Sequence, residues 1–145
     1  MASEASSYEN TPYALLGGED GVRRLTRRFY ELMDTLPEAW DVRRLHPDDL
    51  GNSEQKLFMY LSGWLGGPDL FVASFGHPRL RARHLPFSID SRARDQWMLC
   101  MRLAAEEFIL DTPLRDRLLE ALASLADHMR NVADPIQATK SSAPL

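Results

Sequence analysis

The stretch GHPRLRARHLPF, residues 76–87, decides how the rest of the chain is interpreted. Pro78 can begin a helix because its missing N–H would be unpaired there, and Pro86 disfavours helix at the residue before it. About two helical turns are therefore predicted between the prolines, with His84 in the last turn. On such a helix the face with His84 is otherwise apolar, while arginines form a second face.

This short helix has the residue types of a metal-cofactor site. A neutral imidazole is a common metal ligand, and an arginine such as Arg83 is suited to carboxylates. A metal cofactor with acidic side arms, such as heme, fits that description. The alternative is an ordinary helix-end histidine, favoured by the helix dipole, beside a solvated basic face. The stretch alone leaves both interpretations open.

Composition limits the classes of protein. The chain has 145 residues, 44% of them hydrophobic, which is enough for one domain with a substantial core. Its net charge of −4 gives no basis for nucleic-acid binding. No apolar run approaches the roughly 18 residues that span a bilayer. The single cysteine, Cys100, and an N-terminus without the basic and apolar regions of a signal peptide predict a cytoplasmic protein.

Helical spacing of apolar residues predicts four substantial helices joined by short connectors. Such stripes run within residues 19–34, 57–64, 97–108 and 114–129. No segment shows a convincing run of alternating β-branched residues, so we expect an all-α domain. The sequence has no phosphate-binding glycine loop and no Cys/His zinc spacing, so the common cofactor signatures are absent.

Capping residues predict where these helices begin. Asp90 and Thr112 are the expected N-caps of the last two helices, and Asn52 with Gln55 could form a capping box for the second. Residues 69–75 show no clear periodicity, so we expect an apolar linker of low helicity there.

Three residues outside the basic helix are candidate polar groups. Tyr30 borders the first apolar stripe, where a tyrosine either extends its hydroxyl to water or directs it into a pocket. His46 precedes Pro47 and is expected in a loop. Trp97 begins the stripe of the long third helix, where core packing is the usual role.

The order of several short motifs resembles that of group II truncated hemoglobins. The motifs are Arg28-Phe29-Tyr30, Leu45-His46-Pro47, Gly66-Gly67-Pro68, Gly76-His77-Pro78, Arg83-His84-Leu85-Pro86-Phe87, Arg94-Asp95-Gln96-Trp97 and Cys100-Met101. The sharpest are residues 84–87 and Trp97, because a tryptophan at that position separates group II from its relatives. The resemblance implies a truncated globin domain over residues 12–131, a two-over-two helical sandwich around heme b. Residues 1–11 and 132–145 are expected to be a flexible N-terminal extension and a flexible C-terminal tail.

The resemblance also implies roles for individual residues. His84 matches the proximal ligand, whose ring nitrogen binds the iron. The three polar positions on the distal side correspond to Tyr30, His46 and Trp97. The other cofactor-binding positions correspond to Ser53, Lys56, Leu57, Arg83 and Phe87. Within that set, Lys56 and Arg83 match cationic positions that hold heme propionates. The family often carries tyrosine where this chain has His46.

The chemistry so implied is the binding of dioxygen and other diatomic ligands at a polar distal pocket. Ferrous iron passes partial negative charge to dioxygen, so the Tyr30 hydroxyl, the Trp97 indole N–H and a protonated His46 would each stabilise it by about 1–3 kcal/mol when desolvated. Release should then be slow. This favours redox chemistry or detoxification of oxygen, nitric oxide or peroxide, with heme peroxidase or nitric oxide dioxygenase activity and a reductase partner.

Two alternatives remain open from the sequence. The same pocket would serve oxygen storage, delivery or sensing without turnover. A heme-free helical interaction module would use the three distal candidates only for packing or surface. The sequence gives no indication of the oligomeric state.

Overall fold

The computed structural model describes residues 10–134 of the chain, and within these residues the secondary structure is entirely helical. The long helices are α3 (Gly18–Thr35), α5 (Gly51–Trp64), α8 (Ser91–Phe108) and α9 (Thr112–His128). The shorter segments are α2 (Pro12–Leu15), the 3-10 helix η1 (Pro37–Ala39), α4 (Trp40–Arg43), α6 (Leu70–Phe75) and α7 (Leu80–His84). The predicted all-α architecture with four substantial helices is confirmed.

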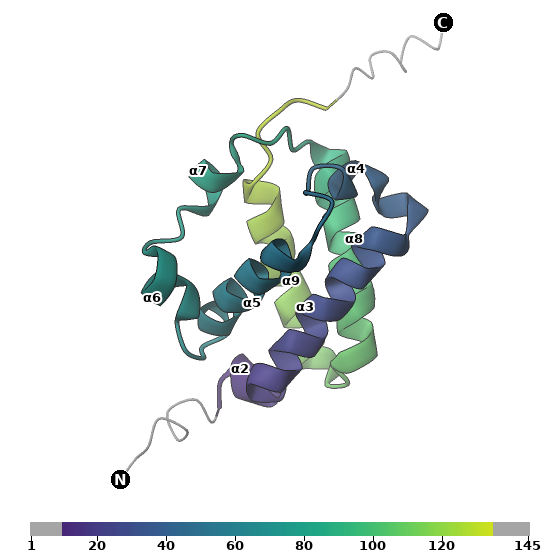
Figure 1. Cartoon of the computed structure of the whole chain (residues 1–145). Helices are drawn as coiled ribbons and strands as arrows, with labels where there is room; N and C mark the ends of the chain where they lie inside the picture. Colours follow the sequence, from purple (N-terminus) through teal and green to yellow (C-terminus); the bar gives the residue numbers. More distant parts are fainter. Residues whose placement is uncertain (1–9, 135–145) are drawn as a thin grey trace, which may run out of the picture.

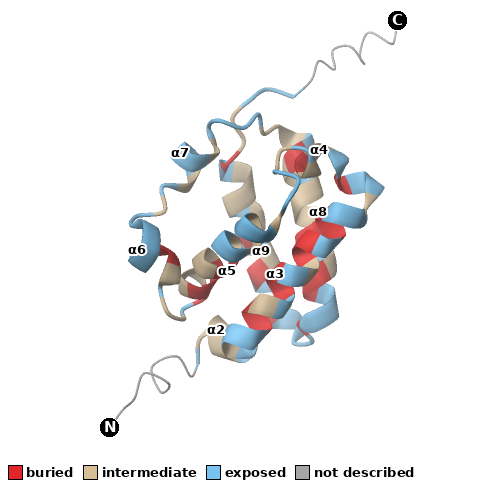
Figure 2. Ribbon diagram, viewed as in Figure 1, coloured by how far each residue is buried: buried red, intermediate tan, exposed pale blue. Residues whose placement is uncertain are grey.

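The long helices enclose one apolar core (Figure 1). Helix α3 packs against both α8 and α5, and α8 packs against α9. Figure 2 shows the buried residues gathered in the middle of the bundle, where α3 lies beside α8. The largest fully buried apolar side chains are Val22, Phe29, Met33, Phe58, Leu61, Cys100 and Met101. Burial of these side chains holds α3, α5 and α8 at fixed rotations about their axes.

Glycines make the turns that bring the helices together. Gly17 and Gly66 have φ of 105° and 96°, a region that residues with a side chain rarely adopt. Where α2 meets α3, a Cβ atom on Gly21 would lie 1.8 Å from the carbonyl oxygen of Leu16. That close approach leaves room only for glycine.

The expectation of low helicity for residues 69–75 was wrong. Helix α6 occupies this segment and buries Phe71, whose ring lies 6.2 Å from that of Tyr60 on α5. A helix this short has too few residues to display a stripe, so its periodicity cannot be recognised in the sequence.

The structure confirms one of the three predicted helix caps and differs from the other two. The Asp90 carboxylate caps α8 by accepting a backbone N–H 2.9 Å away, as predicted. Asp111 rather than Thr112 caps α9, because the Asp111 carboxylate accepts a backbone N–H at 3.1 Å. The capping box of Asn52 and Gln55 is absent, since α5 already includes Asn52 in its first turn.

Helix α7 is shorter than predicted. Pro78 lies outside the helix, and Arg79 precedes it with a φ of 44°, which is uncommon for a residue other than glycine. This left-handed residue turns the chain between α6 and α7. His84 still lies in the last turn of α7, as the sequence predicted.

The ends of the domain are described only in part. Within the predicted C-terminal tail, the Val132 N–H donates to the Ile89 carbonyl at 3.3 Å, and the Asp134 carboxylate accepts the Ser91 N–H at 2.9 Å. Residues 1–9 and 135–145 lie outside the described residues, so the domain boundaries stay predictions. Within residues 10–134 no helix is long and apolar enough to cross a membrane.

Candidate functional site

Phe29 on α3 joins two of the predicted site residues. Its ring contacts Tyr30 edge-on at a centroid distance of 4.8 Å and Trp97 on α8 at 4.9 Å. The Tyr30 ring lies 5.8 Å from the His46 ring, which comes from the loop before α5. The fold therefore brings Tyr30, His46 and Trp97 into one cluster. Sequence reasoning treated Phe29 only as a core residue and missed this connecting role.

Tyr30 has 6% of its surface exposed, and its hydroxyl makes no hydrogen bond to residues 10–134. The hydroxyl oxygen is not among the fully buried unpaired atoms of those residues, so it keeps contact with solvent at the edge of the core. The core hydroxyls of Thr26 and Ser62 instead donate to backbone carbonyls. Burial and the nearby Glu54 carboxylate raise the pKa of the Tyr30 phenol, which stays neutral at physiological pH. The cluster thus contains an unused hydrogen-bond donor.

The ring of His46 is held by its own chain. Its Nδ1 lies 2.9 Å from the carbonyl oxygen of Val42, so Nδ1 carries the proton and donates it. Burial lowers the pKa of His46, and the charges of Arg43 and His84 lower it further, against the opposing effect of the Val42 carbonyl. The imidazole is therefore neutral at pH 7, and its Nε2 is an acceptor. The lowered pKa of His46 therefore disfavours the protonated donor considered from the sequence.

Three other predicted site residues are half-buried. Trp97 is half-buried and packs against the core, and its indole N–H has no partner in the described part of the chain. Leu57 on α5 is likewise half-buried against the core. Ser53, one turn earlier on α5, is half-buried and has no hydrogen bond to the other described side chains.

His84 presents one free ring nitrogen. Its Nδ1 lies 2.6 Å from the Leu80 carbonyl oxygen one turn earlier on α7, which leaves the lone pair of Nε2 available. Among the described residues no group of three or more His, Cys, Asp or Glu side chains could hold a metal ion. A metal at His84 would thus have one protein ligand and take its others from elsewhere, as heme iron does from its macrocycle.

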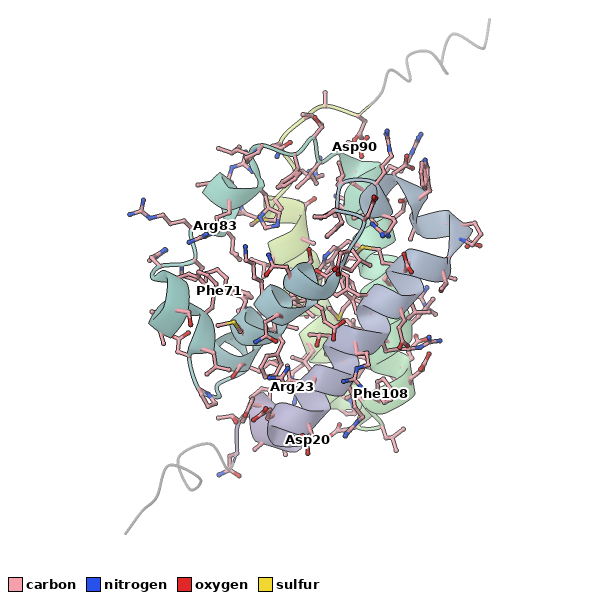
Figure 3. The ribbon with its side chains drawn as sticks, viewed as in Figure 1. Asp20, Arg23, Phe71, Arg83, Asp90 and Phe108 are labelled. Carbon is pink, nitrogen blue, oxygen red and sulfur yellow. The ribbon has the colours of Figure 1, made fainter. Side chains whose placement is uncertain are left out.

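The two predicted propionate partners lie over aromatic side chains of α6. The Arg83 guanidinium is 5.2 Å from the ring centroid of Phe71, and Figure 3 shows the two side by side. The Lys56 ammonium is 5.6 Å from the ring centroid of Phe75. Arg83 also donates to the Pro78 carbonyl. Both cations remain exposed at this edge of the molecule, where they could meet acidic groups.

The segment around α6 and α7 exposes large apolar side chains. Phe75 is 44% exposed, Leu85 57% and Phe87 43%. Large apolar side chains left exposed on neighbouring short segments are candidates for covering a bound apolar group. Together with the unpaired Tyr30 hydroxyl and the free nitrogen of His84, this surface fits an apolar group that carries a metal and acidic side arms.

These features define a class of protein, a globin-type heme protein. The profile of the family described as "Bacterial-like globin" matches residues 11–131, most of the chain. The chain belongs to this family, and within it to the group II truncated hemoglobins, which bind diatomic ligands through heme.

Named relatives support this assignment. "Group 2 truncated hemoglobin YjbI" of Bacillus subtilis is 37% identical over 122 residues, covering 84% of this chain and 89% of the relative. The group II 2-on-2 hemoglobin of Agrobacterium tumefaciens has a TM-score of 0.83 and 49% identity, covering 86% of this chain and 95% of that one. A truncated oxygen-avid haemoglobin from Bacillus subtilis has a TM-score of 0.76 and 37% identity, covering 84% and 100%. The predicted two-over-two fold is confirmed.

The unpaired hydroxyl leads to a stability prediction. Tyr30→Phe removes no hydrogen bond, so the heme-free protein should unfold with an unchanged or larger free energy. The matched control is Ser62→Ala, which deletes a buried hydroxyl that donates to the Pro68 carbonyl at 2.6 Å and should lower that free energy by about 1 kcal/mol. Urea unfolding measures both. A clear loss of stability in Tyr30→Phe would mean that the hydroxyl is already paired.

The lowered pKa of His46 leads to a pH prediction. In the unfolded chain the imidazole titrates at about pH 6.5, and in the folded protein it titrates lower. The contribution of neutral His46 to the free energy of unfolding is complete above the unfolded-state pKa. It is lost as the pH falls through the folded-state pKa, because the unfolded chain takes up the His46 proton at a higher pH than the folded protein does. Urea unfolding between about pH 8 and 5 should show a steeper decline for the wild type than for His46→Phe. Parallel curves would contradict the lowered pKa.

Proposed function

We propose that this protein binds dioxygen and related diatomic ligands at heme b for redox chemistry or detoxification. The observation that carries the proposal is the Tyr30 hydroxyl, which makes no hydrogen bond to residues 10–134 and belongs to a ring that lies next to His46 and one ring away from Trp97. Membership of the group II family supports the heme itself.

The proposed site divides the candidate residues by role. His84 would hold the iron through Nε2, and Lys56 with Arg83 would pair with the propionates. The macrocycle would be bordered by Ser53, Leu57 and Phe87. Heme supplies an iron that binds diatomic gases and exchanges electrons with them.

The protein's own contribution lies on the distal side. The Tyr30 hydroxyl and the Trp97 indole N–H are two donors without partners among residues 10–134, so both are available to a diatomic ligand. Neutral His46 is an acceptor whose ring lies 5.8 Å from that of Tyr30, so a small rotation of either ring would let it compete with the ligand for the tyrosine hydroxyl. Its role is therefore to adjust the orientation of that hydroxyl rather than to donate.

Two donors around one ligand support retention rather than release. A carrier must release its ligand, whereas slow release gives time for electron transfer or for reaction with a second molecule. The oxygen-avid relative from Bacillus subtilis supports the same conclusion. Turnover of the peroxidase or nitric oxide dioxygenase kind would require a reductase as partner. The cytoplasmic location remains a prediction from the sequence.

The assignment of the iron ligand leads to a spectroscopic prediction. His84→Ala should lose heme or bind it weakly, because it deletes the one protein nitrogen proposed to hold the iron. Absorbance in the Soret region and heme content of the purified protein measure the loss. The controls are His77→Ala and His128→Ala, which change exposed histidines and should keep the wild-type spectrum. Normal heme content and an unchanged spectrum in His84→Ala would refute the assignment.

The distal donors lead to a kinetic prediction. Trp97→Phe keeps most of the ring but deletes the N–H, so the dioxygen off-rate should rise about tenfold, the factor given by about 1.4 kcal/mol. Tyr30→Phe should act in the same direction. The double variant should depart from additivity because both donors share one ligand.

Carbon monoxide provides the internal control for these variants, because it carries less negative charge and should respond less to both. Stopped-flow ligand replacement measures the off-rates. Unchanged dioxygen release in both single variants would favour oxygen storage or delivery over redox chemistry.

A further inference from the structure

Helix α7, which carries His84, has little support from the other helices. It packs extensively against none of them within the described residues, and most of its side chains are exposed. Figure 1 shows it at one side of the molecule, away from α3 and α8. A five-residue helix is not stable by itself. Its position must therefore be set by specific bonds.

One residue that follows α9, Asn131, bonds the last residue of α7 and the chain directly after it. The Asn131 side-chain amide donates to the carbonyl oxygens of His84 at 3.1 Å and Phe87 at 2.9 Å. Its amide oxygen accepts the Ile89 N–H at 3.0 Å, and its backbone N–H donates to the Ile89 carbonyl at 2.9 Å. Asparagine suits this position because it combines two N–H donors with an acceptor on a short side chain.

A second pair of hydrogen bonds is donated by a residue of α7 to backbone carbonyls at the end of α9. One terminal nitrogen of the Arg81 guanidinium donates to the carbonyl oxygens of His128 at 2.7 Å and Arg130 at 2.8 Å. The last carbonyls of a helix have no partners within the helix and attract cations. Arg81 thus ties α7 to the same short segment that contains Asn131.

We infer that Asn131 and Arg81 are positioning residues for His84, an inference that rests on the proposed role of His84 as iron ligand. Leu80 holds the imidazole through Nδ1, and Asn131 holds the backbone carbonyl of the same histidine. The segment after α9 thereby sets where the free Nε2 lies relative to the bundle. We call residues 128–131 together with Arg81 the α9 clamp.

The test compares clamp variants with a control from the same part of the chain. Asn131→Ala removes the side-chain amide, and Arg81→Met removes the guanidinium at an exposed position where folding is not threatened. The control is Asp134→Ala, which deletes a bond to Ser91 at the start of α8 and touches nothing in α7. Three measurements on the purified heme protein apply: hydrogen exchange of residues 84–89, the heme-loss rate and the iron–histidine stretching band in resonance Raman spectra.

In both clamp variants the backbone amides of residues 84–89 should exchange hydrogen faster than in the wild type, and the iron–histidine band should shift or broaden. Heme should be lost about fivefold faster, the factor given by one hydrogen bond of ordinary strength. Asp134→Ala should match the wild type in all three. An unmoved band despite faster exchange would make the clamp merely structural and overturn the inference, and so would equal effects in Asp134→Ala. A wild type without the band would instead refute the proposed ligation by His84.

Discussion

Burial of one face of α3 against α8 is the contact on which the site depends. Phe29 is completely buried in that contact, and its ring touches Trp97 across it. Successive residues of a helix are rotated by about 100°, so fixing Phe29 in the core also fixes Tyr30 at the edge of the core. The same packing thus supplies stability and aims two polar side chains at one region.

The two histidines of this region each use one ring nitrogen for a hydrogen bond and leave the other ring nitrogen without a partner among residues 10–134. His46 and His84 each use Nδ1 to hold a backbone carbonyl four residues earlier, which leaves both Nε2 atoms free. Within residues 10–134 the Tyr30 hydroxyl and the Trp97 indole N–H have no hydrogen-bond partner either, whereas the core hydroxyls of Thr26 and Ser62 donate to backbone carbonyls. Donors that the fold leaves without a protein partner are available to a bound ligand.

The two sides of the site are built by different means. Tyr30 and Trp97, the two proposed distal donors, are placed by close packing of α3 against α8, whereas His46 lies in the loop before α5. His84, the proposed proximal ligand, lies on a short helix held by hydrogen bonds to the end of α9. A chain that ended before residue 128 would lack the carbonyls and the amide that hold this helix.

The sequence by itself determined the long helices, the Asp90 cap and the motifs that resemble group II truncated hemoglobins. These features depend on local spacing and on the steric properties of single residues, which can be recognised without a fold. Only the tertiary structure decided that α6 is helical, that His46 is an acceptor, that Phe29 joins the distal residues and that Asn131 supports His84. Each of these depends on a neighbour distant in the chain or on the burial and pairing of a group, and periodicity carries no information about either.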